Sequence, residues 1–210
     1  MGSKSHHTEL ARIYDRFAAT YEQNRGLFDM TDILDDFCRH LDGPGKLLDL
    51  GCGAGEPFAK TFVDCRWDVT GVDFSNHMLE LARRFVPGMK TIHADMCAVQ
   101  FDAGQFDAIT AIYSMFHVPR TAHAKLFDSC HRWLRPGGYF LFTYATRSWT
   151  GADRFDGYKE FMGERLYYSH ERPDELWHTL SDVGFDIVSA EDRSIGGETF
   201  LWVTVRKKPQ

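Results

Sequence analysis

The sequence predicts an α/β fold of the doubly wound type, with a mostly parallel sheet and helices on both of its faces. Two observations support this prediction. Between residues 46 and 145, short apolar segments of strand-like length alternate with segments whose apolar residues recur at helical spacing. Glycine and proline residues interrupt the chain near several of the junctions. Such an alternation forms a parallel sheet that is covered on both faces and binds ligands at the carboxyl ends of its strands.

Two amphipathic helices precede the sheet. Apolar residues recur at helical spacing from Leu10 to Tyr21 and again from Met30 to Leu41. The run Gly43-Pro44-Gly45 ends the second helix. The first 42 residues are therefore expected to form a helical segment in front of the sheet.

The alternation of strands and helices follows. Ser75 is a typical N-cap for a helix that runs to about Phe85, and Arg135-Pro136-Gly137-Gly138 ends the last helix of the series. We expect strands at 46–50, 68–73, 91–95, 106–113 and 139–145, and helices at 57–63, 76–85 and 122–134.

Residues 146–172 interrupt the alternation. This connection is long for a compact domain, and it is rich in aromatic side chains. Long connections of this kind are typical of lids and binding loops. Its aromatic residues and histidine are Trp149, Phe155, Tyr158, Phe161, Tyr167, Tyr168 and His170.

One helix and two strands complete the chain. Pro173 begins the helix, Gly184 ends it, and strands follow at 185–190 and 200–206. The connection between these strands, about ten residues long, contains no helix, which suits an antiparallel pair and not a parallel crossover. We therefore expect the last strand to run against the others. Because no linker or internal repeat is visible, residues 1–210 are expected to form one domain.

Composition argues against several classes of protein. The 210 residues include 24 Lys and Arg against 30 Asp and Glu, a net charge of −6, and 43% hydrophobic residues, unlike a disordered chain. Binding to duplex nucleic acid needs a basic face, so the net charge of −6 argues against a nucleic-acid partner. The five cysteines are scattered without a C-x-x-C pair, so we expect neither disulfides nor a metal site. No apolar run of membrane length or signal peptide is present, so we expect a cytoplasmic protein without a membrane partner.

Glycines and three carboxylates lie where the predicted strands end. The run Leu47-Leu-Asp-Leu-Gly-Cys-Gly-Ala-Gly55 is a strand that leads into a glycine turn, against which a ligand could lie. Asp49 precedes the glycines. Asp73 ends the second strand, where a carboxylate can accept both hydroxyls of a ribose, and Asp95 ends the third. One such Asp could be a turn former, but three at successive strand ends indicate a binding site.

Five motifs extend this pattern: Leu-Asp-Leu-Gly-Cys-Gly-x-Gly, Val-Thr-Gly-Val-Asp-Phe-Ser, His-Ala-Asp-Met, the run from Phe106 to Val118, and Leu-Arg-Pro-Gly-Gly. Together they resemble the class I S-adenosylmethionine-dependent methyltransferases, in the branch of ubiquinone and menaquinone biosynthesis enzymes and many small-molecule methyltransferases. The resemblance implies a seven-stranded sheet with a reversed last strand. It also implies methyl transfer from S-adenosylmethionine to an oxygen or nitrogen atom of a small organic acceptor.

The resemblance divides the chain by role. Residues 1–42, whose Ile-Tyr-Asp-Arg-Phe-Ala-Ala-Thr-Tyr-Glu is similar to the lid helix of that branch, would form a helical lid. Residues 46–145 would bind the cofactor, residues 146–172 would cover the acceptor, and residues 173–210 would close the domain. The implied cofactor contacts are Asp49, Gly51, Cys52, Gly53, Ala111 and Ile112 on the methionine side, Asp73 and Phe74 at the ribose, Asp95 and Met96 at the adenine, Met78, and Tyr14 or Tyr21 closing over the ligand. We expect Cys52 to be a small turn residue and not a nucleophile.

Three side chains are candidate bases. Methyl transfer from a sulfonium depends mainly on proximity and orientation, but an acceptor hydroxyl or ammonium must also lose a proton. His117 follows the fourth strand, Tyr144 ends the fifth, and His170 lies in the segment expected to cover the acceptor, which makes it our preferred base. Each has a structural alternative, since His117 could orient the cofactor pocket and His170 could hydrogen-bond loop backbone.

Other functions remain open at this point. A methyltransferase acting on RNA or protein is disfavoured by the net charge and by Ala-Ile-Tyr-Ser in place of an Asn-Pro-Pro-Tyr-type motif after the fourth strand. A non-catalytic regulatory protein that binds S-adenosylmethionine would share the fold. A dehydrogenase is the weakest alternative because the glycine spacing differs from G-x-G-x-x-G. A monomer and a homodimer are both compatible with the sequence.

Overall fold

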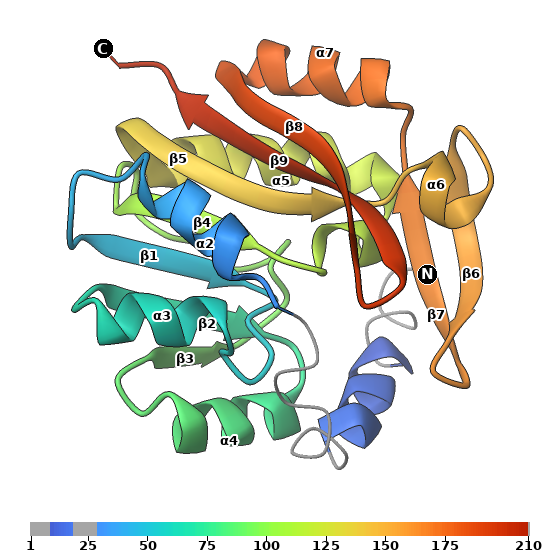
Figure 1. The fold of residues 1–210 in the computed structure, drawn as a ribbon, viewed down its shortest axis with the longest axis horizontal. Coiled ribbons are helices and arrows are strands. Elements are labelled where there is room, and N and C mark those ends of the chain that lie inside the picture. The colour runs from blue at the N-terminus through green and yellow to red at the C-terminus, as the bar shows by residue number, and fades with distance from the viewer. Residues whose placement is uncertain (1–8, 19–28, 210) are drawn as a thin grey trace.

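A seven-stranded sheet forms the centre of the molecule in the computed structural model, which describes residues 9–18 and 29–209 (Figure 1). The strand order is β3-β2-β1-β4-β5-β9-β8. Strand β9 pairs antiparallel with β5 and β8, and the remaining pairs are parallel, as predicted. The strands are β1 (Lys46–Leu50), β2 (Asp68–Asp73), β3 (Lys90–His93), β4 (Phe106–Ala111), β5 (Leu134–Tyr144), β8 (Phe185–Ile195) and β9 (Glu198–Lys207).

Helices cover both faces of the sheet. Helices α5 (Arg120–Trp133) and α7 (Pro173–Val183) share one buried apolar cluster with one face. Helices α2 (Thr31–Cys38), α3 (Phe58–Asp64) and α4 (Asn76–Phe85) share a second cluster with the opposite face. Along β1, Leu48 and Leu50 belong to the first cluster and Leu47 to the second, because successive side chains of a strand point to opposite faces. The predicted doubly wound architecture is therefore confirmed.

Local sequence signals set some of the helix ends. The Ser75 hydroxyl accepts the N–H of Met78 at 3.1 Å and caps α4 as expected. Gly184 ends α7 with a φ of 104°, a left-handed conformation that glycine adopts most readily. Residues 9–18 are helical, which agrees with the described part of the first predicted helix.

Strand β5 corrects one predicted boundary. The sequence predicts a start at residue 139, after a break at Arg135-Pro136-Gly137-Gly138, but the strand begins at Leu134. Phe106 pairs with Leu134 and Ala108 with Tyr139, so the register shifts between these pairs. The proline and the glycines therefore lie in an irregularity within the strand, where a missing donor and unusual torsions are tolerated.

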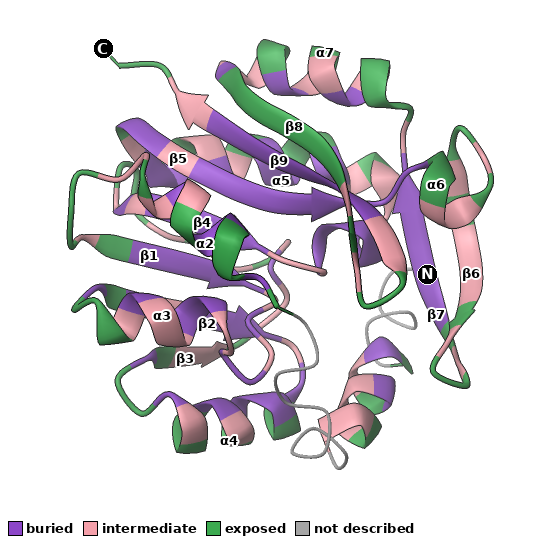
Figure 2. Ribbon diagram, in the orientation of Figure 1, coloured by how far each residue is buried: buried purple, intermediate pink, exposed green. Residues whose placement is uncertain are grey.

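Residues 146–172 form an ordered hairpin where the sequence suggested a lid or binding loop. A short helix, α6 (Arg147–Thr150), leads into the antiparallel strands β6 (Phe155–Phe161) and β7 (Glu164–His170). Met162 and Gly163 form the tight turn between the strands, with φ values of 50° and 78°. Strand β7 is buried for most of its length and β6 only partly (Figure 2). The hairpin thus packs against the rest of the molecule mainly through β7.

No helix among the described residues has both the length and the apolar character needed to cross a membrane. Within the same part of the chain, no group of three or more His, Cys, Asp or Glu side chains is arranged to hold a metal ion.

Candidate active site

A cavity lies at the carboxyl ends of β1, β2 and β4, the sheet edge that the fold predicts for a ligand. It encloses about 840 Å³ when the open space at its mouth is included. The lining residues are Tyr14, Met30, Asp49, residues 51–58, Asp73, Phe74, Met78, residues 112–114 and His117.

The glycine turn after β1 forms the floor of this cavity. Gly51 has a φ of 74° and donates its N–H to the carbonyl of Val72 at 2.7 Å. A Cβ atom on Gly51 would lie 2.4 Å from the Cβ of Ser114, so no side chain fits there. A Cβ atom on Gly53, where φ is 51°, would meet no atom within 4 Å. Gly53 therefore presents bare backbone to open space, and a ligand can approach the main chain there.

Asp73 links the glycine turn to the end of β2. Its carboxylate accepts the N–H of Gly53 at 2.9 Å and the N–H of Ser75 at 2.8 Å. Burial raises the pKa of Asp73, and these backbone hydrogen bonds act in the opposite direction. Because each carboxylate oxygen has a second lone pair, the group can still accept hydrogen bonds from a ligand in the cavity.

Asp49 is the second buried carboxylate in the cavity wall. It is 4% exposed, and one of its oxygens accepts the hydroxyl of Thr110 at 2.8 Å. Burial raises the pKa of Asp49 to about 7. The nearby charge of Asp73 also raises this pKa, whereas the hydrogen bond from Thr110 lowers it. The site therefore holds a carboxylate that would be stabilised by a cationic group of a ligand.

A hydrogen bond between Tyr14 and His117 joins the N-terminal helix to the segment after β4. The Tyr14 hydroxyl lies 2.8 Å from Nε2 of His117, and Nδ1 of His117 lies 2.7 Å from the carbonyl oxygen of Tyr167. Because a carbonyl only accepts, Nδ1 carries the proton, and neutral Nε2 accepts from Tyr14. Burial lowers the pKa of His117 to about 4. His117 is therefore neutral at pH 7, with its free lone pair directed at Tyr14.

The structure brings most of the predicted cofactor residues together. Met96 does not line the cavity, but its Cε would lie 3.3 Å from a Cβ on Gly51. Asp95 accepts the N–H of Cys97 at 2.8 Å, and Ala111 is fully buried. Tyr21 lies outside the described residues. The predicted residues that line the cavity are Tyr14, Asp49, Gly51, Cys52, Gly53, Asp73, Phe74, Met78, Ile112 and His117.

Cys52 has the environment of a structural residue. Burial, followed by the charges of Asp73 and Asp49, raises the pKa of its thiol. A protonated thiol is a poor nucleophile. The environment of Cys52 therefore favours a role as a small turn residue over a role as a nucleophile, as the sequence analysis expected.

Tyr144 and His170 do not line the cavity. The Tyr144 hydroxyl contacts Nδ1 of His123 at 3.0 Å and accepts the N–H of Glu171 at 3.0 Å. His170 contacts the Thr150 hydroxyl through Nε2 at 2.7 Å and the Glu171 carbonyl through Nδ1 at 3.0 Å. The partners of both side chains are protein groups, as are those of His117, but only His117 lines the cavity. This geometry favours His117 over the preferred base of the sequence analysis, His170.

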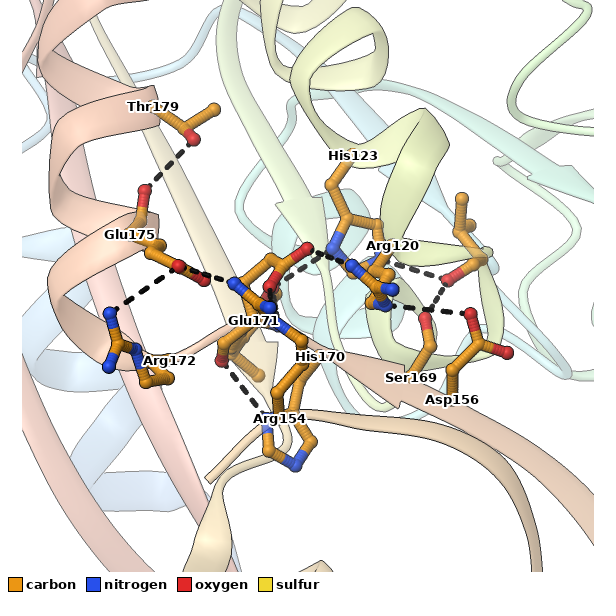
Figure 3. A network of polar contacts seen from close by, with 12 residues as sticks. Arg120, His123, Arg154, Asp156, Ser169, His170, Glu171, Arg172, Glu175 and Thr179 are labelled. Atoms are coloured by element: carbon orange, nitrogen blue, oxygen red, sulfur yellow. Dashed lines mark hydrogen bonds and ion pairs between the residues drawn. The ribbon is translucent and has the colours of Figure 1, made fainter. Parts of the chain in front are cut away.

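A polar network connects the end of the hairpin to the segment after β4 (Figure 3). Ser169 donates its hydroxyl to the carbonyl of Val118 at 2.6 Å, and Arg120 pairs with Glu171 at 2.5 Å. Together with the bond between His117 and the Tyr167 carbonyl, these contacts attach β7 to the segment after β4. The hairpin therefore holds the ring of His117 in place through the Tyr167 carbonyl.

Several lining residues were not predicted. Tyr113 follows β4 with a φ of 53°, and its N–H donates to the Thr143 hydroxyl at 2.6 Å. Ser114 donates its hydroxyl to the carbonyl of Leu50 at 2.7 Å. A positive φ at a non-glycine residue is often found at functional sites, but it leaves no mark in the residue type. The position directly after a strand is the signal that could have identified Tyr113 and Ser114.

The chain is similar in sequence to known methyltransferases. Residues 47–138 match a protein family described as "Methyltransferase domain". The chain is 28% identical over 164 residues to a phosphoethanolamine N-methyltransferase of Plasmodium falciparum, covering 76% of this chain and 60% of that protein. It is 31% identical over 163 residues to phosphoethanolamine N-methyltransferase 3 of Arabidopsis thaliana, covering 72% of this chain and 31% of that protein. The chain thus spans less than two thirds of these relatives.

A solved structure shares the fold over nearly the whole chain. It is the 1,6-didemethyltoxoflavin-N1-methyltransferase of Burkholderia thailandensis with bound 1,6-didemethyltoxoflavin and S-adenosylhomocysteine. The TM-score is 0.71 at 22% identity, with 97% of this chain and 90% of that chain covered. The two proteins therefore share the fold of the sheet and its helices.

Proposed function

We propose that this chain, a class I S-adenosylmethionine-dependent methyltransferase by its fold and its matched domain, transfers a methyl group to an oxygen or nitrogen atom of a small organic acceptor. The observation that carries the proposal is the Tyr14–His117 hydrogen bond at the wall of a cavity that also contains Asp49 and Asp73. A base and a cofactor-type binding site thus share one cavity, which is what methyl transfer to a protic acceptor requires.

The residues present fit S-adenosylmethionine. The open backbone at Gly53 would take the main body of the ligand, Asp73 would accept the ribose hydroxyls, and Asp49 would face the methionine ammonium. The bound cofactor supplies a methyl carbon on a positive sulfur, so an acceptor lone pair forms the new bond while the carbon–sulfur electron pair stays on sulfur. The protein's contribution is to hold both partners in line.

Tyr14 and His117 would remove the proton of the acceptor. His117 is neutral at pH 7 because burial lowers its pKa to about 4, and the Tyr167 carbonyl holds Nδ1–H. The Tyr14 oxygen can accept a hydrogen bond from the acceptor while its own proton is donated to Nε2. A proton can therefore pass from the acceptor through the Tyr14 hydroxyl to His117.

The small size of the acceptor is supported by the names of the relatives, which refer to phosphoethanolamine and 1,6-didemethyltoxoflavin. It is also supported by the net charge of −6, which disfavours polyanionic acceptors such as RNA.

Turnover of variants would test this function. The purified protein is mixed with S-adenosylmethionine and a panel of small amines, phenols and alcohols, and release of S-adenosylhomocysteine is followed. His117→Asn should lower kcat by about 100-fold or more, and Tyr14→Phe should lower it by about tenfold or more, the range of general base catalysis. Their affinity for S-adenosylhomocysteine should stay within about threefold of wild type, since neither residue is expected to bind its charged groups.

Variants at the other candidate bases serve as controls. His170→Gln should keep kcat within a few-fold, and Tyr144→Phe should destabilise the protein by about 2 kcal/mol, because two buried hydrogen-bond partners lose their contact. A collapse of kcat in His170→Gln with normal cofactor affinity would reassign the base. Absence of methyl transfer across the panel would contradict the proposed function.

A further inference from the structure

Glu198 is a carboxylate at the sheet edge that holds the cavity. It is the first residue of β9, and because β9 runs antiparallel to its neighbour β5, this end lies at the carboxyl edge of the parallel strands. Figure 1 shows the turn between β8 and β9 on the side toward which the arrowheads of β1 and β5 point. The cavity, the N-terminal helix and Glu198 therefore share one end of the molecule.

The face of β9 that carries Glu198 is aromatic. Side chains two residues apart on a strand share a face, so Glu198 lies on the same face as Phe200 and Trp202. The ring of Phe200 stacks on Phe116 with centroids 4.6 Å apart and lies 5.5 Å from the ring of Tyr113, which lines the cavity. Glu198 thus stands at the edge of an aromatic wall that continues into the cavity.

Three phenols are within electrostatic reach of Glu198. Burial is the main cause of the raised pKa values of Tyr14, Tyr113 and Tyr168, and the negative charge of Glu198 raises all three further. The Tyr168 ring packs 5.0 Å from the ring of His117. The carboxylate is therefore close to the residues proposed to take the acceptor's proton.

Nothing in the described part of the chain neutralises Glu198. Its side chain is half-buried, and its carboxylate makes no hydrogen bond or ion pair with any described residue. Burial raises its pKa to about 7, with no cation acting in the opposite direction. The ammonium of Lys159 in the neighbouring hairpin is engaged elsewhere, because it lies over the Trp149 ring at 4.8 Å and donates to the Trp149 carbonyl. A half-buried carboxylate without an ion-pair partner is solvated by water or protonated, and the cation of a ligand would favour its ionised form.

The charged residues of the cavity wall also favour a cationic ligand. They are Asp49, Glu56 and Asp73, and within the described ranges neither Lys nor Arg lines the wall. Phosphate and carboxylate groups are usually held by Arg, Lys or clustered backbone N–H groups. The wall is therefore better suited to a cationic ligand than to an anionic one.

We propose that the acceptor is a small amine that enters as an ammonium ion, and that Glu198 with the ring of Tyr113 recognises this cation. The inference rests on the function proposed above. A carboxylate and aromatic faces both attract an ammonium ion, and the attraction is strengthened where water is partly excluded. Glu198 would thus select for amines over neutral alcohols of the same shape.

The reaction balances with this acceptor. The ammonium gives one proton through Tyr14 to His117, an uphill transfer because the pKa of His117 is about 4, and a nitrogen lone pair is left. That lone pair forms the nitrogen–carbon bond as the carbon–sulfur bond breaks, with its electron pair remaining on sulfur. The methylated nitrogen carries the positive charge, and His117 returns its proton to solvent.

Binding of matched probes to the protein saturated with S-adenosylhomocysteine would test this inference. Phenethylamine, 2-phenylethanol and 3-phenylpropionate have similar shapes but carry a cation, no charge and an anion, and their affinities are measured by calorimetry at about pH 8. Phenethylamine should bind about tenfold or more tightly than 2-phenylethanol, and 3-phenylpropionate should bind most weakly. Glu198→Gln should remove this preference, and Glu198→Asp should retain most of it.

Asp192→Asn is the matched control. Asp192 is an exposed carboxylate of β8 in the same hairpin, so its substitution removes the same charge without touching the aromatic wall. It should leave the amine preference unchanged, and all variants should keep wild-type affinity for S-adenosylhomocysteine. Equal binding of amine and alcohol, failure of phenethylamine to bind, or an unchanged preference in Glu198→Gln would overturn the inference. Methylation of hydroxy compounds alone would overturn it as well, while leaving the methyltransferase function intact.

Discussion

At the scale of single residues, burial sets the charge of the groups that line the cavity. It raises the pKa of Asp49 to about 7 and lowers the pKa of His117 to about 4, because low-dielectric surroundings disfavour the charged form of each group. His117 is therefore a neutral acceptor at pH 7, while Asp49 is only partly ionised. A ligand that carries a cation would draw Asp49 toward its ionised form.

The affinity for S-adenosylhomocysteine should therefore rise with pH through the neutral range. The ligand's ammonium attracts Asp49 only when the carboxylate is ionised, so below about pH 7 binding must first release a proton and affinity falls by up to about tenfold per pH unit. Calorimetric titrations from about pH 5.5 to about pH 8 measure this slope. Asp49→Asn should bind more weakly and without the slope. The same slope in that variant would assign the proton to another group.

At the scale of elements, two turns and one hairpin create the site. The glycine turn after β1 exposes backbone to the cavity at Gly53, while the segment after β4 carries Tyr113 and His117. The hairpin of β6 and β7 then holds His117 through the Tyr167 carbonyl. The two turns line the cavity, and the hairpin contributes no lining residue but supports His117.

Gly53→Ala should abolish tight cofactor binding without unfolding the protein. The added methyl group meets no protein atom within 4 Å and occupies the space left for the ligand, so the dissociation constant of S-adenosylhomocysteine should rise by about 30-fold or more. Gly163→Ala, at a φ of 78° and also in open space, is the control for backbone strain. Both should lose about 1 kcal/mol of unfolding free energy in urea titrations. Wild-type affinity in Gly53→Ala would place the ligand elsewhere.

At the scale of the whole molecule, the sheet joins two apolar clusters that lie on its opposite faces. The cavity lies at the end of this sheet, between strands and the N-terminal helix, and both are in place only in the folded state. A ligand of this cavity therefore binds the folded protein and has no counterpart site in the unfolded chain. Its binding free energy adds directly to the stability of the fold.

S-adenosylhomocysteine should raise the melting temperature. At a free concentration about 100 times its dissociation constant, it adds about 2.7 kcal/mol to the unfolding free energy, which corresponds to a shift of roughly 5–10 °C for a domain of this size. Differential scanning fluorimetry measures the shift. NAD at the same concentration should have no effect, and a larger shift with NAD would favour the dehydrogenase alternative.

The sequence alone predicted the fold class, the reversed direction of the last strand, and most of the predicted cofactor residues that the structure places around the cavity. These features depend on local patterns: apolar periodicity, a glycine run such as Gly51-x-Gly53, and carboxylates such as Asp73 at strand ends. Backbone geometry and strand direction largely determine where the residues of such patterns lie in the fold. The start of β5 and the hairpin at 146–172 were missed, because a register shift and a two-residue turn are decided by pairing partners.

Only the tertiary structure distinguished the candidate bases. From residue types and positions in the sequence, His117, Tyr144 and His170 are all plausible, and His170 is preferred. In the folded chain, Nε2 of His117 meets Tyr14 at the cavity, whereas His170 meets Thr150 and Tyr144 meets His123. Glu198 likewise has no motif around it, and its aromatic surroundings come from segments far apart in the chain. The charge and direction of a side chain depend on burial and on distant partners, which a local pattern does not encode.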